Sequence, residues 1–281
     1  MGHCREAPAA AGRPPRSPRY DSPMTLRERA LELLLLTDAD RKARETQALA
    51  HYLPIDAAAV IAEPAGVPGH PARPVLVPHT QLRRGSLATR EGHAALLHAV
   101  AHIEFNAINL ALDAIWRFAG LPDDYYRDWA QVAREEAYHF QLMRDHLATL
   151  GFGYGDFPAH DALWRMTERT AGDVVARMAL VPRTLEARGL DASPPMQAKL
   201  RGMGDTRGVA ILEIILRDEI GHVAIGNRWY RWLCERAGLD PVAHYAVLTE
   251  RHEAPRPQPP FNVDARRQAG FTADELARLR A

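Results

Sequence analysis

Two tetrapeptides, Glu136-Ala-Tyr-His139 and Glu219-Ile-Gly-His222, share the pattern Glu-x-x-His, and each is preceded by a second acid. Residues three apart on a helix lie on one face, so the Glu and His of each pair can bind the same metal ion. A single such tetrapeptide is weak evidence, because chance supplies on the order of one in a chain of this size. Two copies inside long helical patterns predict paired metal ligands in a helical protein.

Apolar side chains surround both motifs at helical spacing. The positions that share a face with Glu136 are Trp129, Val132, Ala133, Phe140, Met143 and Leu147. Those around Glu219 are Leu212, Ile215, Leu216 and Val223, and those around Glu104 are Leu97, Val100, Ala101, Ala107, Ile108, Ala111 and Ile115. An apolar stripe on a helix faces the core. All three acids are therefore predicted to be buried.

The spacing of the acids indicates two related helical hairpins. A helix that contains Glu104 runs to the turn Gly120-Leu121-Pro122, and Glu136 lies about equally far beyond this turn. At about 1.5 Å per residue, both carboxylates reach the same depth in an antiparallel pair of helices. Glu104 and Glu136 are 32 positions apart, and Glu186 and Glu219 are 33 apart. The same arrangement is therefore predicted in the second half of the chain.

Four carboxylates and two imidazoles in an apolar core require compensating charge. An isolated buried charge costs several kcal/mol or is forced into its neutral form. Two divalent cations balance four carboxylates, which predicts a dinuclear metal site. Mixed carboxylate and imidazole ligands disfavour calcium, and the lack of thiolates disfavours a structural zinc site. The predicted cofactor is two iron ions, with manganese as the alternative.

The whole chain reads as an all-α protein. Helical patterns cover Thr25–Ala50, Thr89–Ala119, Pro122–Leu150, His160–Thr170, Gly172–Arg188, Asp205–Ala237, Pro241–Arg251 and Thr272–Arg280. Prolines between 53 and 78 predict a long wrapping loop, because proline removes a helical hydrogen bond. We expect a disordered tail at 1–24, a helical domain at 25–254 with its bundle core at about 89–237, and a C-terminal extension at 255–281 with a short helix.

The composition is that of an ordinary globular protein, with 281 residues, 35 basic and 35 acidic side chains, and 47% hydrophobic residues. A formal net charge of zero argues against bulk electrostatic binding of nucleic acid or anionic membrane. The longest candidate for a membrane span, Leu31–Leu36, is interrupted by Glu32 and is far shorter than the roughly 20 residues needed. Cys4 and Cys234 cannot form a disulfide framework, so we expect a cytoplasmic protein.

One set of residues resembles the ligand pattern of the ferritin-like di-iron carboxylate superfamily, namely Glu104, Glu136-x-x-His139, Glu186 and Glu219-x-x-His222. Within that superfamily, the stretch from Arg177 to Asp191, RMALVPRTLEARGLD, is similar to a bacterial family called domain of unknown function 455. The resemblance covers roughly residues 25–254. It implies a ferritin-like antiparallel four-helix bundle with added N- and C-terminal helices, and two metal ions held by these six residues. It also implies that Glu135 and Asp218 accept hydrogen bonds from the ligand histidines across the bundle.

Glu186, the metal ligand expected from the third helix of the bundle, is the assignment with the most alternatives. Glu186 lies four residues after Pro182 and three before Gly189, where we expect the helix to kink or end. Glu168 and Glu213 are therefore alternatives to Glu186. The segment after Gly189, which contains two prolines, is expected to interrupt the helix and could open a route to the metal ions.

Other polar residues allow two readings each. Glu135 is either an outer contact of a ligand histidine or a solvent-facing acid, and Tyr138 is either an electron-transfer residue beside the metal ions or a packing residue. His98 and His102 are one turn apart near Glu104, and we favour hydrogen-bonded spacers over ligands. A set of arginines either faces an anionic substrate or faces solvent, and its members are Arg177, Arg183 and Arg188.

The features together favour an oxidoreductase that uses O₂ and an electron donor to hydroxylate or otherwise oxidise a small organic substrate, as a monomer or a homodimer. A tRNA hydroxylase family has a similar ligand pattern, but the neutral charge disfavours nucleic acid. Iron storage or sensing is the non-enzymatic alternative. A structural bundle with a vestigial site is disfavoured by the intact ligand set. We expect the loop at 53–78 to cover a substrate pocket, which favours an enzyme.

Overall fold

The computed structural model of the protein describes residues 23–50, 52–82 and 85–279, so the predicted tail at 1–24 lies almost wholly outside the described residues. Within them the regular structure is helical, and the β-type pairing is one isolated parallel bridge between Leu76 and Ala159. The prediction of an all-α protein is confirmed. The elements are α1 (Leu26–Leu34), α2 (Ala39–Gln47), η1 (His79–Gln81), α3 (Arg90–Arg117), α4 (Asp123–Thr149), α5 (Ala162–Arg169), α6 (Val174–Leu180), η2 (Val181–Glu186), α7 (Ala187–Gly202), α8 (Thr206–Arg236), α9 (Pro241–Arg251), α10 (Val263–Gln268) and α11 (Ala273–Arg278).

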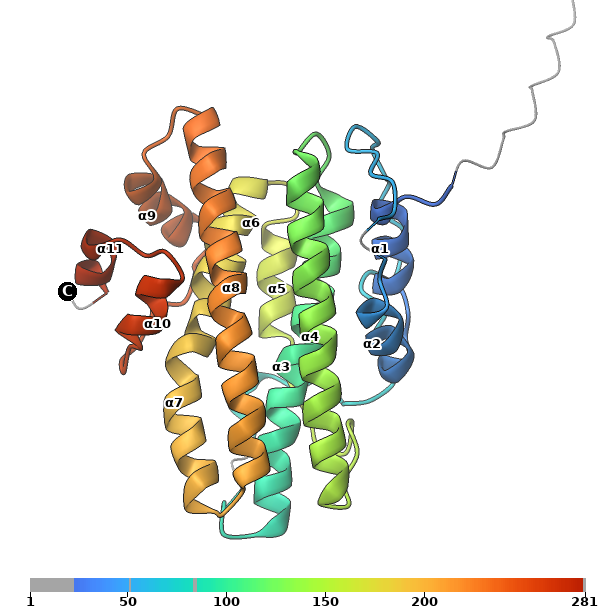
Figure 1. The fold of residues 1–281 in the computed structure, drawn as a ribbon, viewed down its shortest axis with the longest axis vertical. Coiled ribbons are helices and arrows are strands. Elements are labelled where there is room, and N and C mark those ends of the chain that lie inside the picture. The colour runs from blue at the N-terminus through green and yellow to red at the C-terminus, as the bar shows by residue number, and fades with distance from the viewer. Residues whose placement is uncertain (1–22, 51, 83–84, 280–281) are drawn as a thin grey trace, which may run out of the picture.

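Four long helical segments lie side by side at the centre of the molecule (Figure 1). They are α3, α4, α8 and the continuous segment α6–η2–α7. Helices α3 and α4 form a hairpin, and α8 packs against α4, α6 and α7. In Figure 1, α3 and α8 run upward, whereas α4 and α6–η2–α7 run downward. The long connection that contains α5 allows α4 and α6 to run in the same direction.

Polar side chains at the helix starts explain where the helices begin. Thr25 caps α1 through a capping box, and Asp38 caps α2 by accepting a backbone N–H. Thr89 and Asp205 cap α3 and α8 in the same way. Such caps satisfy N–H groups that have no partner within the helix. The helical segment predicted at Thr25–Ala50 is thus two helices, α1 and α2, separated near Asp38.

The terminal segments flank the four central segments on opposite sides (Figure 1). Helix α1 packs on α3 and α2 packs on α4, while α10 contacts α7 and α8. The chain from 53 to 78 is irregular, as its prolines predict, and it follows the α1 side. Buried cations hold it there: Arg27 donates to the Asp56 carbonyl at 2.9 Å, and Lys42 donates to the Gly69 carbonyl at 3.0 Å.

The C-terminal extension has more structure than the sequence predicted. Helix α11 corresponds to the predicted helix Thr272–Arg280, but α10 was not predicted. Both helices pack around a second apolar cluster that includes Val223 of α8 and Phe271. An ion pair of 2.6 Å between Arg266 of α10 and Asp191 of α7 adds to this contact.

Helix α7 extends further than the sequence predicted. We expected the helix to end near Gly189, but α7 continues through both of its prolines. Pro194 lacks the N–H that would pair with the Leu190 carbonyl, and the Asn262 side chain donates to this carbonyl instead, at 3.2 Å. The C-terminal extension thus replaces a helical hydrogen bond that proline removes, so the helix is not interrupted.

A single wide turn, η2, joins α6 to α7. It is π-helical and contains Pro182, whose ring does not fit a regular α-helical turn. The kink expected at Pro182 therefore takes the form of this wide turn. Gly226 of α8 lies against the ring, since a Cβ atom added at Gly226 would come 2.4 Å from the Pro182 Cβ. Helix α8 approaches η2 this closely because position 226 has no side chain.

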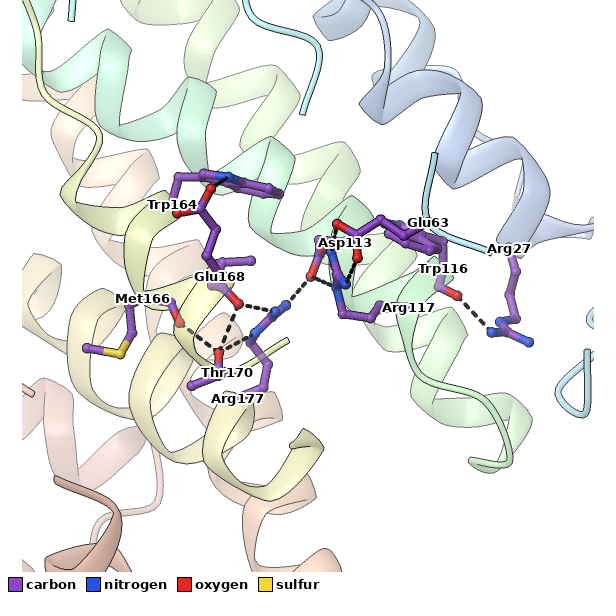
Figure 2. Close-up of polar contacts among 11 residues, drawn as sticks. Arg27, Glu63, Asp113, Trp116, Arg117, Trp164, Met166, Glu168, Thr170 and Arg177 are labelled. Carbon is purple, nitrogen blue, oxygen red and sulfur yellow. Dashed lines mark hydrogen bonds and ion pairs between the residues drawn. The ribbon is translucent and has the colours of Figure 1, made fainter. Parts of the chain in front are cut away.

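A buried ion pair ties α6 to α3 (Figure 2). Arg177 pairs with Asp113, and its guanidinium also donates to the Thr170 hydroxyl at 2.8 Å and to the Thr167 carbonyl at 2.6 Å. Arg117 donates to Asp113 at 2.9 Å from the next turn of α3. The Asp113 carboxylate therefore accepts from two guanidinium groups in the protein interior, and the position of η2 relative to α3 is fixed by charge as well as by packing.

The three arginines considered as a substrate-facing set do not form one. Arg177 and Arg183 are buried, at 1% and 4% exposure, and each is paired with an acid. Arg188 is exposed. The reading of a solvated face is wrong for Arg177 and Arg183, because both are buried and internal carboxylates neutralise them.

Among the described helices, α3 alone is long and apolar enough to pass as a membrane span by length and composition. Its most apolar stretch is 78% buried inside the protein. The apolar composition of α3 therefore matches its place at the centre of the fold, between α1, α4 and α5.

Gly226→Ala should destabilise the protein by about 1–3 kcal/mol, because the added methyl group overlaps the Pro182 ring. Gly221→Ala is the matched control, since it lies in the same helix and its Cβ would meet no atom within 4 Å. The control should be neutral or more stable by up to about 1 kcal/mol, as expected for glycine replaced by alanine in a helix. Urea unfolding of both variants measures the difference, and equal stabilities would contradict the close contact.

Candidate metal centre

The four central helical segments each contribute acids or histidines to one buried cluster. Glu104 comes from α3, Glu136 and His139 from α4, and Glu219 from α8. All four are buried, and each offers a ligand atom within 4.8 Å of the others. The structure thus contains a buried carboxylate and histidine cluster with the composition of a metal site.

Glu136 lies at the centre of this cluster, between two imidazoles. One carboxylate oxygen is 2.8 Å from His222 Nδ1, and the other is 3.4 Å from His139 Nδ1. Glu104 approaches the same His139 atom at 3.4 Å, and Glu219 approaches His222 Nδ1 at 3.9 Å. Both histidines therefore direct Nδ1 toward the carboxylates.

The outer nitrogen of each imidazole contacts an acid on the opposite helix. His139 Nε2 of α4 lies 3.1 Å from Asp218 of α8, and His222 Nε2 of α8 lies 2.7 Å from Glu135 of α4. A hydrogen bond at Nε2 fixes the proton on that nitrogen and leaves the Nδ1 lone pair for another partner. The acid before each Glu-x-x-His motif thus orients the histidine of the other motif.

The cluster has more buried acceptor atoms than its hydrogen bonds use. Within this cluster, the buried ligand-type atoms without a hydrogen-bond partner are Glu104 Oε2, Glu136 Oε1 and Oε2, His139 Nδ1, Glu186 Oε2, Glu219 Oε2 and His222 Nδ1. Such unsatisfied groups are rare in protein interiors, and each costs free energy. A cation placed among them would satisfy all seven, so the residues present fit a metal site.

Glu186 completes the set from η2. Its carboxylate interacts electrostatically with Glu104, Glu136 and His222, although it is not one of the four residues in the tightest group. The two alternatives for this position lie elsewhere. Glu168 is exposed and accepts from the Trp164 ring N–H at 3.0 Å, and Glu213 is exposed on α8.

The comparisons with known proteins place the chain in a family. Residues 35–277 match the family described as "Protein of unknown function (DUF455)". The chain belongs to this family. It is also 52% identical over 213 residues to an uncharacterized protein from Haemophilus influenzae (strain ATCC 51907 / DSM 11121 / KW20 / Rd), which covers 73% of this chain and 74% of that protein. No solved structure matches the chain. The comparisons name no activity for DUF455.

Tyr138 does not lie inside the cluster of this DUF455 member. It is 37% exposed, and its ring packs beside the His139 ring with centroids 6.3 Å apart. It lines a surface hollow together with Glu135. Glu135 itself is half-buried, because one of its oxygens faces His222 while the residue remains partly in contact with solvent.

His98 and His102 occupy hydrogen-bonded positions outside the cluster. His102 Nδ1 lies 2.9 Å from the Tyr154 hydroxyl, and its Nε2 lies 3.0 Å from the His160 carbonyl. His98 Nε2 accepts the Gly155 N–H at 2.9 Å. Burial lowers the pKa of both histidines to about 4, so both are neutral at pH 7. This placement agrees with the interpretation of both residues as spacers.

Two outer residues near the cluster were not identified from the sequence. Arg217 donates to Asp218 at 2.8 Å, and Gln131 donates to Glu135 at 3.1 Å. They hold the two acids that orient the histidines. Gln131 lies four residues before Glu135, so helical spacing could have identified it, whereas Arg217 is a neighbour in sequence with no distinguishing pattern.

Burial raises the pKa of three acids in the cluster. The pKa of Glu104 rises to about 7, that of Glu186 to about 8, and that of Glu219 well above its ordinary value. Loss of hydration opposes ionisation of each carboxyl, and the charge on Glu136 adds to the effect. Without a bound cation Glu186 and Glu219 are mostly protonated near neutral pH, and Glu104 is partly protonated.

Glu136 has the opposite shift. Burial disfavours its charge, but His222 and His139 hold its pKa below the ordinary range. The imidazoles shift in the matching direction, because Asp218 raises the pKa of His139 and Glu136 raises that of His222, in each case against the effect of burial. The metal-free centre is therefore one carboxylate between imidazolium groups, and a divalent cation would take the place of protons.

The cavities of the molecule do not match the predicted substrate cover. The Pro-rich segment 53–78 closes a cavity of about 20 Å³ next to His102 and Tyr154, which is too small for an organic substrate. A larger hollow of about 410 Å³ lies between η2 and the C-terminal extension, where Arg183, Thr184 and Tyr245 line it. The expectation that the Pro-rich loop covers a substrate pocket therefore stays a prediction, since this small cavity does not supply such a pocket.

Removal of metal with a chelator should make the protein less stable as pH rises. Glu104 and Glu186, with pKa values raised to about 7 and about 8, keep protons in the fold that the unfolded chain releases above about pH 4.5. In that window each such group lowers the free energy of unfolding by about 1.4 kcal/mol per pH unit. Above the pKa values that these groups have in the folded protein, the free energy of unfolding falls no further on their account.

Urea unfolding between about pH 5 and about pH 8 tests this pH dependence. Metal-loaded protein should lose less stability than chelated protein, because bound cations keep the carboxylates ionised in the fold at every pH in the window. Identical pH profiles with and without metal would show that these acids do not carry the raised pKa values.

Proposed function

We propose that the protein is a dinuclear metal protein with a ferritin-like four-helix bundle, and that it is an O₂-dependent oxidoreductase acting on a small organic substrate with an external electron donor. The observation that carries the proposal is the set of seven buried, unpartnered ligand atoms that converge from four helical segments. Iron is the proposed metal, with manganese as the alternative, because the donors are carboxylates and imidazoles.

The ligands divide into two related halves. Glu104, Glu136 and His139 would hold one ion, and Glu186, Glu219 and His222 would hold the other. Glu136 faces both histidines, at 2.8 Å and 3.4 Å, so it is positioned between the two halves. The directions of the four central segments support the ferritin-like fold, because two hairpins joined by a long connection give this order.

The residues around the centre have distinct tasks in this proposal. Asp218 and Glu135 fix the tautomers of the two histidines so that each Nδ1 faces the ions. Glu136, His139 and His222 are fully buried, so bulk water does not reach them. Bound iron would supply the electrons and open coordination positions needed to reduce O₂, and the protein supplies geometry and a dry site.

The hollow between η2 and the C-terminal extension is the proposed location of the substrate. Its volume of about 410 Å³ suits a small organic molecule. Arg183 and Thr184 line it, and the same turn carries Glu186. Wide π-helical turns are frequent at functional sites. The turn η2 thus carries both residues that line the hollow and the proposed metal ligand Glu186. This connection between a substrate site and the metal site supports an enzyme over an iron store.

Metal analysis of protein reconstituted with Fe²⁺ under anaerobic conditions should find at least two ions per chain, two of them at this cluster from the charge balance between four carboxylates and two divalent ions. Glu136→Ala and His222→Ala should each lose at least one ion. Glu168→Ala and Glu213→Ala are matched controls, since both acids are exposed, and they should load normally. Normal loading of both ligand variants would place the metal site elsewhere.

Stepwise addition of Fe²⁺ in the presence of O₂ separates an enzyme from a store. The oxidoreductase should oxidise about two Fe²⁺ per chain and then stop until a reductant and substrate are added, because only the two ions of the proposed dinuclear centre react with O₂ in this proposal. Ferric absorbance and particle size follow the reaction. Uptake of many iron ions per chain into a large soluble particle would favour storage and overturn the oxidoreductase proposal.

A further inference from the structure

A second cluster of ligand-type side chains lies at the end of the molecule where α3 begins, α4 ends and α8 begins, at the bottom of Figure 1. It consists of His93 of α3, His146 of α4 and Asp205, the N-cap of α8. Each residue offers one donor atom, and these atoms lie within 4.8 Å of one another. None of the three belongs to the dinuclear cluster.

Both histidines direct the same nitrogen at one carboxylate. His93 Nε2 lies 2.7 Å from Asp205 Oδ2, and His146 Nε2 lies 2.8 Å from that same oxygen. The rings make an edge contact, with centroids 6.4 Å apart. Two imidazole nitrogens and one carboxylate therefore converge on a single point from three separate elements.

We propose that His93, His146 and Asp205 form a mononuclear site for a divalent transition-metal ion of the zinc type. Two imidazoles and one carboxylate are a recurrent ligand set for zinc and for non-haem iron, with positions left for water. The metal binds neutral imidazole, so the ion replaces the protons that now lie between Nε2 and Asp205. One carboxylate and a divalent ion leave a net positive site that can bind a further anion.

The surroundings hold the three donors in place. Asp205 Oδ1 accepts the Gly208 N–H at 2.7 Å, so the carboxylate is fixed by its role as a helix cap. The side chains of His146 and Asp205 are 7% and 6% exposed, whereas that of His93 is 16% exposed. The cluster is thus rigid on its inner side and accessible from the His93 side, as a metal site with open positions requires.

The site is separate from the dinuclear centre. His146 lies seven residues after His139 on α4, and His93 lies eleven residues before Glu104 on α3, which correspond to about 10 Å and about 16 Å along the helices. An ion bound here would join three central helices at one end of the molecule. Because the unfolded chain lacks this arrangement, bound metal should stabilise the fold.

Zinc binding to chelated, full-length protein tests the proposal. Asp205→Asn keeps a good helix cap and removes the charged ligand, so it should bind one zinc ion fewer per chain than the unsubstituted protein. His93→Gln should lose the same ion. His244→Gln, the same substitution on α9, is the matched control and should bind as much zinc as the unsubstituted protein.

The dinuclear centre is controlled separately with Glu136→Ala, which should retain the ion that Asp205→Asn loses. Zinc should raise the melting temperature of Glu136→Ala and raise it less in Glu136→Ala with His93→Gln. If the dinuclear proposal fails, the total number of zinc ions per chain changes. The difference in zinc-induced melting temperature between Glu136→Ala and Glu136→Ala with His93→Gln remains. Equal zinc binding by His93→Gln and the unsubstituted protein would overturn the second site. If Asp205→Asn does not fold, His93→Gln alone decides the outcome.

Discussion

The burial of the Glu136 carboxylate between two imidazoles is the constraint on which the rest of the structure depends. A charge without water contact is tolerated only where opposite charge lies beside it. His222 at 2.8 Å and His139 at 3.4 Å supply that charge from α8 and α4. Both helices must therefore keep one separation and one register, and the apolar side chains around them can pack in only one way.

The outer parts of the molecule serve this constraint. Arg177 pairs with Asp113 and sets α6 against α3, while the absence of a side chain at Gly226 lets η2 approach α8. Together these contacts bring Glu186 to the same depth as the acids of the other helices. The C-terminal extension contributes a hydrogen bond to α7 where a proline removes one.

Helical periodicity explains how much the sequence predicted. Glu104, Glu136 and His139 lie on local apolar stripes and near a short turn, so their burial and common depth follow from positions near one another in the chain. The full length of α7 does not, because its completing donor, Asn262, is 72 residues from Leu190. The contact between His93 and Asp205 spans 112 residues and has no local pattern. These two features depend on residues that are distant in the sequence.

The hydrogen bonds at the centre cross between the two halves. Asp218 lies on α8 but orients His139 of α4. Glu135 lies on α4 but orients His222 of α8. A shift of either helix therefore disturbs one ligand directly and the other through its orienting acid. Each half is preorganised by the other, so occupation of one half lowers the free-energy cost of ordering the second. In the proposed dinuclear site, such reciprocal coupling would make the binding of two ions cooperative, with singly loaded protein as a minor species.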